Sequence, residues 1–115
     1  MEMITKERKV NLTELSKMAE NMFGDLVKAV VDIEQEIMAI DAELHADQEA
    51  FLLEKGSRQQ NLWGINLYPE IAEDDWVEFD SMINMRPSMG NRSRGVDDPE
   101  VRQRIMEIVG KLVER

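Results

Sequence analysis

The loop 86–95 (RPSMGNRSRG) holds three arginines and no acidic residue, in a chain whose formal net charge is −10. Arginine presents a planar fork of N–H donors that binds phosphate or carboxylate groups in a bidentate manner. The loop leads into a predicted helix, and the free N–H groups at a helix start also favour anions. We therefore predict that Arg86, Asn91, Arg92 and Arg94 bind an anionic ligand or partner.

An internal role for the same loop is the competing interpretation. Long loops in compact domains are uncommon and are either functional or held by specific contacts. Arg92 and Arg94 are close in sequence to several carboxylates with which they can form ion pairs. These carboxylates are Glu78, Asp80, Asp97 and Asp98. In that case the arginines would attach the loop to the rest of the fold.

His45 is the only histidine of the chain and the only side chain that ordinarily titrates near neutral pH. With Glu43, Asp47 and Asp80 it forms a weak candidate set of metal ligands. The chain has no cysteine, so it has no thiolate ligand and no thiol nucleophile. We predict no metal site and no cofactor. His45 is the candidate catalytic residue, and its alternative role is a hydrogen bond at a strand end.

Length and composition predict a single domain over residues 1–115, with residues 1–10 loosely attached. No apolar segment reaches the length of a membrane span, and the charged first residues do not resemble a signal peptide. We therefore expect a cytoplasmic protein without membrane contact. The acidic charge argues against nonspecific binding to nucleic acids, because that affinity comes mainly from neutralised phosphates.

Hydrophobic periodicity predicts elements in the order α-β-β-α-β-β-α. Asn11 and Glu14 form a capping-box pattern at the first helix, and Asp98 with Pro99 is a typical start for the last one. The predicted strands cover residues 26–33, 37–44, 62–68 and 76–83, and the middle helix covers 47–55. We expect an α+β fold with a four-stranded, mainly antiparallel sheet and helices packed on one face.

Three motifs carry a resemblance to a known family. These are ELHAD at 43–47, LWGINLYP at 62–69 and the RP and GNRSRG segments of the loop 86–95. The chain resembles small prokaryotic proteins grouped as a domain of unknown function, over nearly its whole length after Val10. The resemblance implies a stand-alone domain of about this length. It implies no activity, cofactor or catalytic residue.

Three functional hypotheses follow from these patterns. The first is a binding or interaction module that uses the arginine-rich loop to engage an anionic ligand or a protein partner. The second is a small phosphoester hydrolase or nuclease that uses His45 with the loop arginines. The third is a self-associating protein, such as a homodimer formed through open sheet edges, in which the loop is purely structural.

Overall fold

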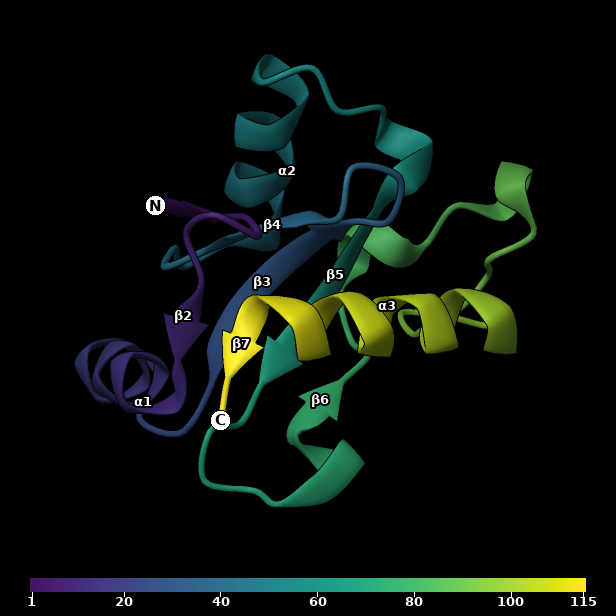
Figure 1. The fold of residues 1–115 in the computed structure, drawn as a ribbon. Coiled ribbons are helices and arrows are strands. Elements are labelled where there is room, and N and C mark those ends of the chain that lie inside the picture. Colours follow the sequence, from purple (N-terminus) through teal and green to yellow (C-terminus); the bar gives the residue numbers. More distant parts are fainter.

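In the computed structural model, which describes residues 1–115, apolar segments from the middle of the chain form an antiparallel sheet. Its five strands lie in the order β1-β4-β3-β5-β6 (Figure 1). They are β1 (Glu2–Ile4), β3 (Val27–Asp32), β4 (Ile37–Ile40), β5 (Leu62–Leu67) and β6 (Val77–Glu78). The longest ladder joins β3 to β5, and it pairs Lys28 directly with Asn66.

The sequence predicts four strands and a loosely attached N-terminal segment, and both predictions are wrong in detail. β1 pairs with β4, and its Ile4 is completely buried in the core. A second, two-stranded parallel sheet joins β2 (Val10–Asn11) to β7 (Val113–Glu114). The prediction failed because Ile4 and Val10, which are both completely buried, are separated by mostly charged residues. Two isolated apolar residues do not form a recognisable strand pattern.

The predicted strand 76–83 is also much shorter than expected, because only β6 pairs with β5. Beyond it, Ser81 packs so closely on Gly64 that a Cβ added there would lie 2.5 Å from the Ser81 Cβ. At this point the Gly64 backbone pairs with the Asn84 side chain and not with a further strand. Its Oδ1 accepts from the Gly64 N–H at 2.8 Å, and its Nδ2 donates to the Gly64 carbonyl oxygen at 2.9 Å.

Three helices accompany the sheet: α1 (Leu12–Asn21), α2 (His45–Glu54) and α3 (Pro99–Leu112). The capping box of α1 is confirmed, because Asn11 and Glu14 each accept a hydrogen bond from the other's backbone N–H. Asp98 caps α3 as predicted. α2 begins at His45, two residues before the predicted start, with Leu44 at the N-cap.

The helices cover both faces of the sheet, which corrects the prediction of one covered face. α1 and α3 pack with Ala29 and Val31 of β3 in the larger core, and α3 crosses the sheet in front in Figure 1. On the opposite face Leu52 of α2 packs with a second cluster of Val30, Ala39 and Leu62. The reason is visible in β3, where Ala29, Val30 and Val31 are all completely buried. None of the helices combines the length and hydrophobicity needed to cross a bilayer.

Candidate functional site

Arg86 opens the arginine loop and faces inward. Its guanidinium lies over the Trp63 ring, 4.3 Å from the ring centre, and donates to the Leu62 carbonyl oxygen at 2.6 Å. It also donates to the Gln59 carbonyl oxygen. Burial lowers the pKa of Arg86 from its ordinary value, and Glu49 opposes that shift. The fork of Arg86 therefore binds backbone carbonyls at the start of β5.

Asn91 is buried and holds the loop together through its side-chain amide. Its Nδ2 donates to the carbonyl oxygens of Asn84 at 2.7 Å and Gly95 at 2.9 Å. Its Oδ1 accepts from the Asp97 N–H at 2.8 Å. The backbone of Asn91 also forms a two-way bridge with Arg86. These contacts use the donors and the acceptor of Asn91 within the loop.

Arg92 and Arg94 point to different surroundings. The Arg92 backbone N–H donates to Asp97, whereas its guanidinium forms no hydrogen bond or ion pair and lines no cavity. Hydrogen bonds from Ser93 and Arg92 lower the pKa of the Asp97 carboxyl. Arg94 instead forms an ion pair with Asp80, with Nε 2.7 Å from Oδ1. The Arg94 side chain also lines a cavity.

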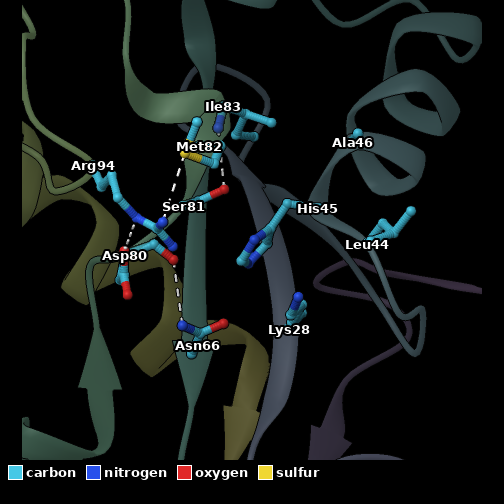
Figure 2. Close-up of a pocket in the computed structure, with 10 residues that line it drawn as sticks. All are labelled: Lys28, Leu44, His45, Ala46, Asn66, Asp80, Ser81, Met82, Ile83 and Arg94. Atoms are coloured by element: carbon cyan, nitrogen blue, oxygen red, sulfur yellow. Dashed lines mark hydrogen bonds and ion pairs between the residues drawn. The ribbon is translucent and has the colours of Figure 1, made fainter.

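This cavity, which we call the His45 cavity, has a volume of about 220 Å³. It lies between the start of α2, the adjacent strands β3 and β5, and the segment 80–83, on the α2 face of the sheet (Figure 2). Four apolar residues line it: Leu44, Ala46, Met82 and Ile83. The polar lining comes from Lys28, His45, Asn66, Asp80, Ser81 and Arg94.

His45 extends from the first turn of α2 over the strands, toward Lys28 and Asn66 (Figure 2). Its Nε2 lies 2.8 Å from the Ile65 carbonyl oxygen, which can only accept, so Nε2 carries the proton. Burial lowers the pKa of His45 from its ordinary value of 6.5, although the hydrogen bond to Ile65 opposes that shift. At neutral pH the ring is therefore uncharged, and Nδ1 is an acceptor without a partner in the chain.

Asn66 contributes a second free acceptor. Its Nδ2 donates to Glu78 Oε1 at 2.8 Å and to the Asp80 carbonyl oxygen at 3.3 Å. The residue is only 7% exposed, and its Oδ1 is buried without a hydrogen-bond partner. Figure 2 shows this oxygen on the side that faces Lys28 and His45. A buried acceptor without a donor is energetically costly, so a ligand that brings a donor to it would gain stability.

The start of α2 forms one wall of the cavity and has no side-chain cap. Leu44 occupies the N-cap position, whereas Asn11 and Asp98 cap the other two helices. The first N–H groups of a helix have no partner within it. Leu44, His45 and Ala46 all line the cavity, so this helix start adds a weak preference for negative charge there.

The predicted site residues are thus only partly brought together. Arg94 shares the cavity with His45 and Asp80, whereas Arg86, Asn91 and Arg92 lie outside it. Glu43 and Asp47, from the weak metal set, do not line it either. No group of three or more His, Asp or Glu side chains in the structure is arranged to hold a metal ion.

Three polar cavity residues were not singled out from the sequence: Lys28, Asn66 and Ser81. A signal for the first two was present, because each interrupts a strand of mostly apolar residues. A charged or amide side chain inside a strand that is buried on both faces needs a partner or a cavity. The sequence does not reveal that Lys28 and Asn66 are direct neighbours in the β3–β5 ladder.

Comparison with known proteins identifies one family. A family model described as "Protein of unknown function (DUF5674)" matches residues 3–112 of the 115-residue chain. This match confirms the resemblance carried by the three sequence motifs. No curated protein and no solved structure shows significant similarity to the chain.

Proposed function

The chain belongs to the DUF5674 family of unknown function, and we propose that it binds a small anionic molecule in the His45 cavity. Arg94 and Lys28 supply the positive charge. The start of α2 and the side chains of His45 and Asn66 orient the ligand. The loop 86–95 takes part through Arg94. Arg86 and Asn91 contribute indirectly, because their contacts hold the loop in shape.

One observation carries this proposal: unused binding groups converge on a single concave site. Ligand pockets commonly combine an apolar lining with a few convergent polar groups. The cavity holds two cationic side chains and one carboxylate, in a chain that is strongly acidic as a whole. Asp80 balances one of the two positive charges and accepts from Arg94 only at Nε. Arg94 Nη1 also donates to the Met82 sulfur, and the Lys28 ammonium lies 5.0 Å from the centre of the Phe23 ring. Arg94 Nη2 and the Lys28 ammonium donate no hydrogen bond in the chain, so both can bind an anion.

A chemical-shift titration of ¹⁵N-labelled protein tests this function. Acetate and inorganic phosphate are the probes, and acetamide is the neutral control. We expect an anion, but not acetamide, to shift the amide signals of His45, Ala46 and Asn66. Arg94→Ala and Lys28→Gln should weaken this response. Arg92→Ala is the matched control, because it removes an exposed arginine of the same loop that lies outside the cavity. The absence of any anion-specific shift near the cavity would rule the function out.

A second function, hydrolysis of phosphate esters, is favoured by the shared position of His45 and Arg94. A neutral imidazole with a free Nδ1 has the properties of a general base, and Arg94 can bind a phosphoryl oxygen. Turnover of a phosphate monoester and a phosphodiester, with and without divalent metal, tests it. Activity that persists unchanged in His45→Ala would remove this role for the histidine.

Self-association remains a prediction. The edge strands β1 and β6 are three and two residues long. Such short edges offer few unpaired backbone groups to a second copy. Light scattering over a range of protein concentrations measures the molar mass and tests the hypothesis, and a monomer at the highest concentration would reject it.

A further inference from the structure

The size of the His45 cavity restricts what it can hold. Its volume of about 220 Å³ lies below the roughly 300–1,000 Å³ of drug-sized pockets. A nucleotide or a peptide segment would extend far outside, whereas a small organic acid fits within it.

The charges around the cavity favour a monoanion. Lys28 and Arg94 are cationic, Asp80 is anionic and His45 is neutral at pH 7, which leaves one net positive charge. A carboxylate matches this charge. A phosphate dianion carries a second negative charge that the cavity does not balance. That charge would lie close to the Asp80 carboxylate, and like charges at short range repel.

The free hydrogen-bonding groups on the cavity floor are acceptors. The buried Asn66 Oδ1 has no donor, and His45 Nδ1 is unprotonated because Nε2 donates to the Ile65 carbonyl. An unsubstituted carboxylate or a phosphate dianion has only acceptor oxygens and would leave both groups unpaired. A ligand that pairs with either acceptor must carry a donor as well. A hydroxyl supplies one donor, enough for the buried Asn66 Oδ1, without adding positive charge beside Lys28.

The mouth of the cavity is apolar. Leu44 is 54% exposed and Met82 is 63% exposed, and both line the cavity together with Ala46 and Ile83. Large apolar side chains that are exposed next to a polar pocket can contact an apolar part of the ligand. A short hydrocarbon tail directed outward would cover these two side chains.

We infer that the cavity binds a small 2-hydroxycarboxylic acid with a short aliphatic tail. Arg94 and Lys28 bind the carboxylate, Asn66 Oδ1 accepts from the hydroxyl, and Leu44 and Met82 contact the tail. This inference rests on the proposed binding function. It goes further because it identifies the ligand by a donor group and a tail as well as by its charge.

Isothermal titration calorimetry with four ligands tests the inference. They are 2-hydroxy-4-methylpentanoate, 4-methylpentanoate, leucine and inorganic phosphate, all titrated at pH 8.5 so that phosphate is the dianion. One hydrogen bond is worth about 1 kcal/mol net, so the hydroxy acid should bind at least about fivefold more tightly than its deoxy analogue. Leucine, which replaces the hydroxyl by an ammonium, and phosphate should bind more weakly than the hydroxy acid.

Two variants test the contact with the hydroxyl and the contact with the tail separately. Asn66→Ala removes one acceptor and should reduce the preference for the hydroxyl, with little change in the affinity for 4-methylpentanoate. Leu44→Ala shortens an exposed side chain that lines the cavity, so the fold should tolerate it. It should weaken binding of the hydroxy acid but leave binding of lactate, which has a much shorter tail, nearly unchanged.

The outcomes distinguish this inference from the function on which it rests. Equal affinity for the hydroxy and deoxy acids, or a preference for leucine or phosphate, would overturn the inference and leave the anion-binding function standing. The inference also fails if Leu44→Ala affects lactate as much as the longer acid. If none of the four ligands binds, and acetate causes no shift in the titration above, both proposals are wrong.

Discussion

Arg86 and Arg94 stand at opposite ends of one loop, and their guanidinium groups meet different surroundings. Arg86 stacks on Trp63 and donates to two backbone carbonyls, so its fork is used inside the protein. Arg94 contacts Asp80 through Nε and the Met82 sulfur through Nη1, and its side chain is 56% exposed. The comparison teaches that the same residue type in one loop can stabilise the fold or remain available to a ligand.

The difference arises from what the chain places opposite each arginine. The loop folds back at Arg86 onto the start of β5, where the carbonyl oxygens of Gln59 and Leu62 accept from its guanidinium. At Arg94 the backbone is held instead. The Arg94 carbonyl oxygen accepts from Asn84 Nδ2 at 3.0 Å and from the Ser81 N–H at 2.9 Å. Its side chain is thereby left at the rim of the cavity.

The largest effect is expected for Asn84→Ala, which removes the side chain that links Gly64 of β5 to Arg94. Asn84 is completely buried, and its side chain satisfies both backbone groups of Gly64 as well as the Arg94 carbonyl. Leaving such groups unpaired costs about 1–3 kcal/mol each, so we expect a loss of about 3–5 kcal/mol in the free energy of unfolding. Urea denaturation measures this loss. Asn21→Ala, at an exposed position, is the control, and a loss below about 1 kcal/mol for Asn84→Ala would contradict the role assigned to its side chain.

A direct test of the comparison is to truncate each arginine in turn. Arg86→Ala should cost about 2–4 kcal/mol, because charged hydrogen bonds and the stacking on Trp63 are lost. Arg94→Ala should cost less than about 1 kcal/mol, since exposed ion pairs contribute little to stability. Equal losses in urea denaturation would break the distinction between the two arginines. Arg86→Lys sharpens it, because an ammonium cannot reproduce the planar fork and should not restore full stability.

The smallest effect is expected for His45, which lines the same cavity as Arg94. Its titration should make the free energy of unfolding depend on pH. Its pKa in the folded protein is lowered, mainly by burial, below the ordinary value of 6.5. The unfolded state therefore binds a proton more readily, and stability falls as the pH drops below about 6.5 until the folded-state pKa is passed. Urea midpoints at pH 7.5 and 5.5 measure the change. His45→Gln should lose stability less over this interval than the unmodified protein, and an equal loss in both would show that the imidazole is not the cause.

Local features were predictable because they depend on residues close together in the chain. The capping box of Asn11 and Glu14, the Asp98 cap and the apolar strand 62–67 all formed as expected. Features that depend on residues far apart in the chain were not predictable in this way. The β-branched side chain of Val30 favours a strand. Its burial, however, depends on Leu52 of α2, which packs on the face of the sheet opposite α1 and α3. The short strand β1 exists only because β4 offers it a partner.

The sequence by itself determined the chemical groups that are available: arginines in a glycine-containing loop, a single histidine and no thiol. It also determined the caps of α1 and α3, because a cap needs only residues three or four positions apart. Only the tertiary structure decided which of those groups meet. Sheet register placed Lys28 beside Asn66, and the packing of α2 brought His45 to the cavity that Arg94 also lines. The physical reason is that such contacts form between segments tens of residues apart, where chain connectivity leaves the relative positions open and burial of the whole core selects one arrangement.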